Sequence, residues 1–256
     1  MPFSENRTQK HQNLSGRKHL AVLLDPDNLT EGSCLNLLAH SESHYVDFFF
    51  VGGSLVTTDN QADIIRLVKA HSDTPVILFP SNSFHIDKQA DGILLLSLIS
   101  GRNPDFLIGQ HVLSAPILKA SRLQIYPTGY ILVDTGRQTT ASYMSGTMPV
   151  PYDKPAIAAC TAMAGELLGL QFIYLDGGSG AWQPVSSEMI AAVRAAVEVP
   201  LIIGGGINTL TKAAAALDAG ADVIVVGNHI EKNPGFLAEV SSLVASYNII
   251  ALGVHR

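Results

Sequence analysis

The sequence predicts an α/β protein with a single (β/α)8 barrel domain, the fold known as the TIM barrel. Two observations lead to this prediction. The chain has 256 residues, close to the usual length of such barrels, and short apolar runs alternate with segments of helical period along it. No linker or shift in composition divides the chain. We expect a flexible polar N-terminal segment over residues 1–16 and the barrel over residues 17–256.

Eight apolar runs are the expected strands. They are continuously apolar rather than alternating, which is typical of strands buried on both faces, as in a parallel sheet. They span residues 19–25, 46–53, 75–80, 92–99, 124–134, 172–178, 200–206 and 222–228.

Helices are expected between the strands, where apolar residues recur at helical spacing. One of them opens with Lys154 followed by proline, which suits a first helical turn, and another begins at Ser186 with a capping signal. The expected helix over residues 209–219 ends before Gly220, and glycine is a common residue at a helix end. The segments are residues 59–71, 104–120, 154–168, 186–197 and 209–219.

Two connections depart from the regular pattern. Residues 81–91 are the whole connection between the third and fourth strands, which is too short for a helix and both of its loops. We therefore expect the third outer helix to be missing or replaced by an extended segment, which leaves an apolar gap in the helical ring. Residues 135–153 are rich in Thr, Ser, Gly, Met and Pro, and we expect a structureless, functional loop there, such as a lid.

Composition narrows the class of protein. Hydrophobic residues make up 47% of the chain, which excludes global disorder, and the net charge of −6 argues against a nucleic-acid partner. The two cysteines, Cys34 and Cys160, are far apart, which fits a reducing compartment. The N-terminus has no signal-peptide pattern, and no apolar stretch approaches the ~18 residues of a membrane span. We expect a cytoplasmic protein without a transmembrane segment.

Glycine clusters follow the sixth, seventh and eighth strands. Chemistry in this fold takes place at the C-terminal ends of the strands, and glycine allows backbone N–H groups to approach an oxyanion closely. Three such turns on adjacent strands favour a phosphate site, although glycine can also simply relieve crowding in barrel turns. The clusters are 177–180 (Gly-Gly-Ser-Gly), 204–206 (Gly-Gly-Gly) and 227–228 (Gly-Asn).

Acidic and hydroxyl side chains end three further strands. Asp25 ends the first strand and Ser54 follows the second, so together they are candidate Mg²⁺ ligands. Tyr174 and Asp176 share one face of the sixth strand, where a carboxylate beside a phosphate site is well placed to accept a proton from a substrate hydroxyl. The alternative roles are turn formation for Asp25, a helix or turn cap for Ser54, and capping of the following turn for Asp176.

Together these strand ends resemble the geranylgeranylglyceryl phosphate synthase family of prenyltransferases. The resemblance runs from about residue 18 to the last helix, and its most specific motifs are YLDGGSGA and SGRNP. The matching segments are 23–28 (LLDPDN), 51–54 (VGGS), 97–112 (SLISGRNPDFLIGQHV), 126–134 (YPTGYILVD), 174–181 (YLDGGSGA), 202–207 (IIGGGI) and 225–228 (VVGN).

The resemblance implies an enzyme that joins sn-glycerol 1-phosphate to C1 of a long polyprenyl diphosphate, most simply geranylgeranyl diphosphate, through an ether bond. It implies Mg²⁺ at Asp25 and Ser54, a catalytic role for Asp176 and Tyr174, and a missing third helix. The family often has Glu in place of Asp176 and Lys in place of Asn28. The implied glycerol-phosphate site is Tyr174, Leu175, Asp176, Gly177, Gly178, Ser179, Gly180, Gly205, Gly206, Gly227 and Asn228.

Two other functions remain open from the residues themselves. The motifs IIGGGI and VVGN also suit an isomerase or synthase that handles phosphoribosyl compounds, and the apolar gap suits a non-catalytic prenyl-lipid-binding barrel. We further expect a homo-oligomer, because the broken helical ring leaves apolar surface to cover. Transient contact with a membrane is also expected. The prenyl chain length and the roles of Arg102, Arg137 and Lys154 stay open at this point.

Overall fold

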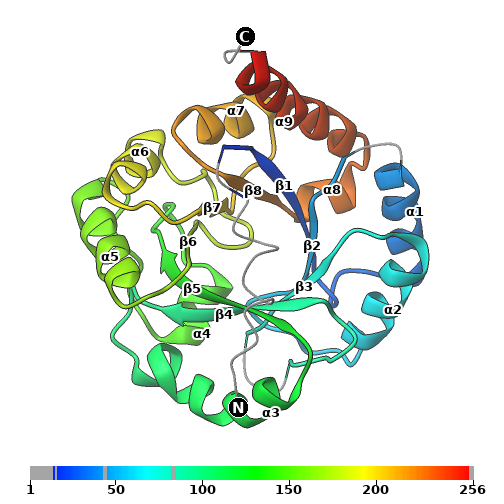
Figure 1. The fold of residues 1–256 in the computed structure, drawn as a ribbon, viewed down its shortest axis with the longest axis horizontal. Coiled ribbons are helices and arrows are strands. Elements are labelled where there is room, and N and C mark those ends of the chain that lie inside the picture. Colours follow the sequence, from blue (N-terminus) through cyan, green and yellow to red (C-terminus); the bar gives the residue numbers. More distant parts are fainter. Residues whose placement is uncertain (1–13, 15, 43–44, 82–84, 254–256) are drawn as a thin grey trace.

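The computed structural model describes residue 14 and residues 16–42, 45–81 and 85–253. Eight parallel strands close into a barrel in the order of the sequence, with β1 paired to β8, as predicted (Figure 1). The strands are β1 His19–Leu24, β2 Phe48–Gly52, β3 Val76–Phe79, β4 Gly92–Leu98, β5 Gln124–Leu132, β6 Phe172–Asp176, β7 Leu201–Gly204 and β8 Val223–Val226.

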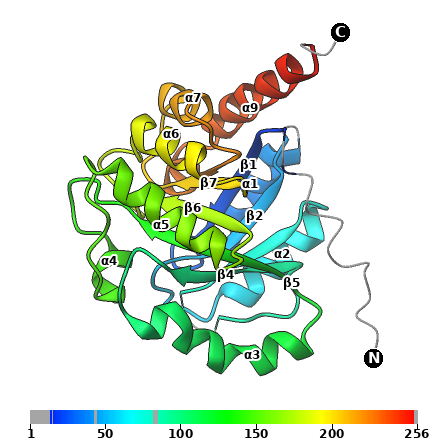
Figure 2. The ribbon, with the colours of Figure 1, turned by 60° about the vertical axis from the view of Figure 1, so that its left-hand side comes forward.

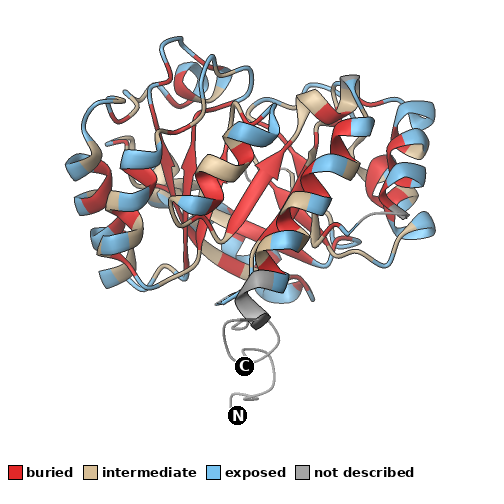
Figure 3. Cartoon of the chain, turned by 90° about the horizontal axis from the view of Figure 1, so that it is seen from above, coloured by how far each residue is buried: buried red, intermediate tan, exposed pale blue. Residues whose placement is uncertain are grey.

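Helices surround the barrel and turn their exposed faces outwards, whereas the strands are buried (Figure 3). They are α1 Glu31–Glu42, α2 Gln61–His71, the π-helical turn η2 Asp105–Gly109, α3 Gln110–Ala120, α4 Thr140–Ser145, α5 Pro155–Leu167, α6 Ser187–Ala196, α7 Leu210–Asp218, α8 Asn228–Lys232 and α9 Gly235–Gly253.

The strands separate two apolar layers. Alternate side chains of each strand point either into the barrel or towards the helices. Phe79, Tyr130 and Tyr174 belong to the inner layer, whereas Leu20 and Leu175 belong to the layer beneath the helices. The alternation therefore determines which residues at a strand end reach the barrel mouth.

The gap in the helical ring is confirmed. Among the described residues between β3 and β4, which are 80–81 and 85–91, none is helical. One side of the barrel wall is thus left without a packed helix. The expected N-terminal segment, residues 1–16, lies almost entirely outside the described residues.

The expectation of a structureless loop at residues 135–153 is wrong. A short helix, α4, forms there because Thr139 and Ser142 cap each other: the Thr139 side chain accepts a hydrogen bond from the Ser142 N–H, and the Ser142 side chain accepts one from the Thr139 N–H. Val150 then pairs with Val133 in an isolated β-bridge. No helix in the described ranges combines the length and apolar character needed to cross a lipid bilayer.

Candidate active site

A polar cavity of about 320 Å³ opens at the C-terminal ends of the strands. It brings together residues at or after the ends of six strands, β1, β2, β3, β6, β7 and β8, and Thr140 of the helix that follows β5. The residues expected from the sequence that line it are Asp25, Ser54, Tyr174, Asp176, Gly178, Ser179, Gly180, Gly205, Gly206, Gly227 and Asn228.

Two expected substrate residues, Leu175 and Gly177, do not line this cavity. Leu175 is fully buried beneath the helices, because it alternates with its inward-facing neighbours on β6. The Gly177 N–H donates to the carbonyl of Gly204 at 3.0 Å, and its carbonyl accepts a hydrogen bond from the Thr135 hydroxyl at 3.2 Å. Leu175 therefore serves packing, and Gly177 fixes the turn that follows β6.

Asp176 is the buried carboxylate of the cavity, with 7% of its surface exposed. Its Oδ1 accepts a hydrogen bond from the Gly178 N–H at 2.7 Å, and its Oδ2 accepts one from the Tyr130 hydroxyl at 2.5 Å. Burial raises the pKa of Asp176 above its usual value, although both hydrogen bonds act in the opposite direction. A carboxylate in this state is a stronger base than one in water.

Tyr130, which was not singled out from the sequence, lines an adjoining apolar groove and contacts Asp176. It lies beside Tyr174 in the register of β5 and β6, and the two rings meet edge to face with centroids 5.4 Å apart. Burial, followed by the charge of Asp176, raises the pKa of both phenols well above 10, so both stay protonated. The alternation within YPTGYILV would have placed Tyr130 inward, but not its contact with Asp176.

The turn after β7 requires glycine. Gly205 has a φ of +81°, and a Cβ there would lie 2.7 Å from the Gly178 nitrogen and 2.9 Å from Oδ1 of Asp176. Across the cavity, the Asn228 side-chain amide donates to the Ser179 hydroxyl at 3.0 Å and joins the turns after β8 and β6. The three predicted glycine turns thus form one continuous wall with accessible backbone groups.

Asp25 lines the same cavity at the end of β1, the strand paired with β8. Its carboxylate packs against Gly53, where a Cβ would come within 3.6 Å of both oxygens, and accepts a hydrogen bond from Asn28 at 2.8 Å. Burial and then the nearby charge of Asp27 raise its pKa, whereas the hydrogen bonds from the Asp27 N–H and from the Asn28 side chain act in the opposite direction. Ser54 lines the same cavity.

Asp27 connects the loop after β1 to the loop after β2 through hydrogen bonds. Its carboxylate accepts hydrogen bonds of 2.8–3.0 Å from the backbone N–H groups and hydroxyls of Thr57 and Thr58. Burial acts to raise its pKa, but these bonds together lower it to about 2. These hydrogen bonds, here called the Asp27 clamp, fix the relative position of the loops that carry Asp25 and Ser54. The spacing of these residues in the sequence does not predict them.

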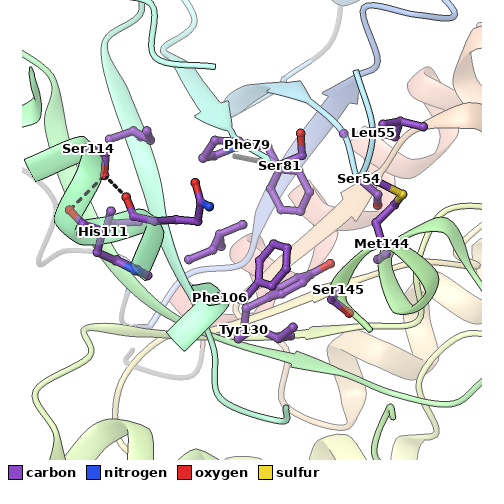
Figure 4. Close-up of a pocket in the computed structure, with 18 of the residues that line it drawn as sticks. Ser54, Leu55, Phe79, Ser81, Phe106, His111, Ser114, Tyr130, Met144 and Ser145 are labelled. Carbon is purple, nitrogen blue, oxygen red and sulfur yellow. Dashed lines mark hydrogen bonds between the residues drawn. The ribbon is translucent and has the colours of Figure 1, made fainter. Parts of the chain in front are cut away.

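An apolar groove of about 230 Å³ adjoins the polar cavity (Figure 4). Both are lined by Gly53, Ser54, Leu55 and Phe79, so the groove is continuous with the cavity. It runs beneath η2 and α3, on the side where the outer helix is missing. Further lining residues are Ser81, Ile86, Leu95, Leu98, Phe106, His111, Ser114, Tyr130, Leu132, Ala141 and Met144.

The three cations considered from the sequence lie outside the polar cavity. Arg102 donates to the carbonyl of Gly101 at 2.8 Å, and it lines a separate outer depression beside α5. Lys154 pairs with its neighbour Asp153 at 3.2 Å, where both side chains are more than half exposed. Arg137 is exposed in the connection before α4. The polar cavity is therefore lined by backbone groups and carboxylates rather than by these cations.

Comparison with known proteins gives a consistent result. The PcrB family model matches residues 12–244. Geranylgeranylglyceryl phosphate synthase of Spirosoma linguale is 60% identical over 92% of this chain and 94% of its own, and that of Thermococcus kodakarensis is 42% identical over 88% and 89%.

A solved structure agrees. The chain is similar to the crystal structure of (S)-3-O-geranylgeranylglyceryl phosphate synthase from Thermoplasma acidophilum in complex with sn-glycerol-1-phosphate. The TM-score is 0.85 at 29% identity, over 92% of this chain and 95% of that one. The resemblance inferred from the strand-end motifs is confirmed. The chain belongs to the PcrB family, together with the geranylgeranylglyceryl phosphate synthases.

Proposed function

We propose that this protein is a prenyltransferase that forms an ether bond between sn-glycerol 1-phosphate and geranylgeranyl diphosphate and releases diphosphate. One observation carries the proposal: a polar cavity built on glycine turns joins an apolar groove, and the Asp176–Tyr130 pair lies where they meet. A phosphoribosyl substrate has no long apolar chain to fill such a groove. A non-catalytic lipid-binding barrel has no use for a buried basic carboxylate at the junction.

The glycine turns after β6, β7 and β8 would hold the glycerol phosphate. Gly178, Gly180, Gly205 and Gly206 line this wall with positive φ, and of these the Gly178 N–H already donates to Asp176 Oδ1. Backbone N–H groups there offer hydrogen bonds to a phosphate without any cationic side chain. This arrangement holds one substrate in a fixed orientation and so makes attack on the other more frequent.

Asp176 would accept the proton of the attacking hydroxyl. As the glycerol oxygen forms its bond to C1 of the prenyl chain, the bond between C1 and the diphosphate oxygen breaks, and its electron pair leaves with diphosphate. The raised pKa of Asp176 favours proton acceptance, and Tyr130 holds the carboxylate in place. Tyr174 packs beside this pair and shapes the wall.

Asp25 and Ser54 fit a Mg²⁺ ion. The carboxylate of Asp25 is partly buried beside Gly53 at the cavity, and no Lys, Arg or His within the described part of the chain forms an ion pair with it. Within the part of the chain that the structure describes, no three His, Cys, Asp or Glu side chains gather into a metal-binding group. Substrate phosphates and water would therefore complete the coordination. When bound, Mg²⁺ neutralises charge on the leaving diphosphate.

The direct test is incubation of the purified protein with radiolabelled geranylgeranyl diphosphate, sn-glycerol 1-phosphate and Mg²⁺. We expect an ether-linked product that resists mild alkaline hydrolysis and that forms poorly from sn-glycerol 3-phosphate. Chelation with EDTA should abolish turnover, and Ser54→Ala should raise the Mg²⁺ concentration needed for half-maximal rate. Absence of product with either enantiomer would refute the proposal, whereas full turnover in EDTA would refute only the metal.

We also infer that the chain forms a homo-oligomer through the outer face of α5. Ile157, Met163, Leu167 and Leu168 are 38–88% exposed there, and the one charged residue of the helix, Glu166, is turned away to the backbone N–H groups of Glu198 and Val199. Exposed apolar patches of this kind mark association sites. Light scattering should give a mass above 27.2 kDa for the wild type and a smaller mass for Leu167→Glu.

A further inference from the structure

The helical segment η2–α3 carries an unusually apolar outer face. Beneath it, the groove is lined by Phe106 and by the polar side chains of Gln110, His111 and Ser114. Its outer face instead carries Ile108, Val112, Leu113 and Ile117, with exposed fractions of 59%, 64%, 64% and 45%. Positions 108, 112, 113 and 117 recur at helical spacing and form one stripe. A surface helix more commonly places such residues inwards, so this stripe is a candidate contact surface.

This face carries no charged residues, and cationic residues follow it at its C-terminal end. Residues 106–118 contain no Asp, Glu, Lys or Arg. The exposed cations Lys119 and Arg122 follow directly, whereas the only acidic residue nearby in the segment, Asp105, lies at its beginning. An apolar helix face bordered by cations matches a helix that lies in the interface of a bilayer containing anionic lipids.

The position of the helix relative to the groove indicates what covers it. The groove runs from Ser54 and Leu55 at the polar cavity to His111 and Ser114 beneath α3 (Figure 4). The same helix therefore walls the groove with one face and exposes the apolar stripe on the other. It lies on the opposite side of the barrel from α9 (Figure 2).

We propose that the outer face of η2–α3 docks on the surface of an anionic phospholipid bilayer. The proposal rests on the proposed function, because a prenyl chain in the groove is an apolar molecule that dissolves in such a bilayer. With this helix in the interface, the chain passes between bilayer and groove without exposing its length to water, which lowers the free-energy cost of transfer. Lys119 and Arg122 face the lipid phosphates.

The test is flotation of the full chain with vesicles of phosphatidylcholine, with and without phosphatidylglycerol. We expect the wild type to float with the anionic vesicles. Leu113→Glu should lower the vesicle partition coefficient roughly tenfold or more, and Lys119→Glu combined with Arg122→Glu should lower it mainly for anionic vesicles. Ile249→Glu is the matched control, because Ile249 is 70% exposed on the remote helix α9 and should leave partition unchanged.

Turnover on detergent-dispersed geranylgeranyl diphosphate separates this proposal from the proposed function. It should be the same in Leu113→Glu and the wild type, because Leu113 does not line the groove. Equal flotation of Leu113→Glu and the wild type, or no flotation of either, would overturn the docking surface while leaving catalysis intact. A fall in molar mass of Leu113→Glu with unchanged flotation would assign the face to a second copy of the chain and also overturn it.

Discussion

The turns after β6, β7 and β8 and the groove beside β3 and β4 lie on different sides of the barrel mouth, and in the proposed function they would recognise ligands by different means. The turns offer backbone groups whose positions depend on glycine at positive φ. The groove offers the volume left by side chains and by an absent helix. A substitution in the turns should therefore affect ligand binding by changing the backbone geometry. A substitution in the groove should affect it by changing the shape of the space for the ligand.

Asp176→Asn should have the largest effect, because it removes the base where the two sides meet. We expect kcat to fall about 10²- to 10⁴-fold, with much smaller changes in KM for either substrate. Steady-state kinetics with each substrate varied in turn measures this. A loss of less than about threefold would mean that proton transfer does not depend on Asp176.

Gly205→Ala should damage the turns and spare the groove. The added methyl group would come within 3 Å of the Gly178 nitrogen and Asp176 Oδ1 at a φ of +81°. We expect kcat/KM for glycerol phosphate to fall roughly 10- to 100-fold. Gly136→Ala is the control, since Gly136 also has positive φ but nothing within 4 Å of its Cβ position. Equal losses in both variants would indicate general backbone strain rather than a defect in the turn.

Ser114→Leu should narrow the groove and leave the glycine turns unchanged. Ser114 lines the groove beneath α3, and a longer side chain there shortens the space for a prenyl chain. We expect KM for geranylgeranyl diphosphate to rise about tenfold, with little change for the shorter farnesyl diphosphate or for glycerol phosphate. Ala115→Leu, on the exposed side of the same helix, should behave as the wild type. A uniform loss for both prenyl lengths would contradict this position for the chain.

Tyr130→Phe tests the hydrogen bond between Tyr130 and Asp176 through the pH dependence of kcat/KM. The Tyr130 hydroxyl lowers the pKa of Asp176, which burial raises. Without that hydrogen bond the pKa rises further, so the acidic limb of the kcat/KM profile should move to higher pH. A pH series over the acidic limb checks the direction. A shift to lower pH would show that Tyr130 favours the protonated carboxyl.

Asp27→Asn should have the smallest effect, because it weakens a clamp outside both binding regions. We expect Tm at neutral pH to fall by about 2–4 °C. The pKa of Asp27 is lowered to about 2, so its stabilising effect is present above the unfolded value of ~3.9 and is lost as pH falls through about 2. The difference in Tm from the wild type should disappear over that range. A constant difference would exclude the carboxylate charge as its cause.

The same contrast explains what could be predicted from the sequence. The glycine turns, Asp25 and Asp176 follow buried strands directly, so fold and local chemistry together were enough to bring them to one edge. The missing helix was predictable from the length of one connection. Tyr130 and Asp27 act through partners 46 and about 30 residues away, which no local pattern reveals. Leu175, which the family resemblance included in the glycerol-phosphate site, lies on the other face of β6 from Tyr174, because side chains alternate along a strand.

The absent helix between β3 and β4 also bears on how a long ligand enters. A molecule held in a closed tunnel must thread through it end first, so each added isoprene unit lengthens the passage. A groove that is bordered by an extended connection, here Ser81 and Ile86, instead of a packed helix would receive the chain from the side in a single step. Association should then depend weakly on chain length, whereas dissociation should slow with every unit buried. The absence of a helix between β3 and β4 would thus determine how the association and dissociation rates of the ligand depend on its length.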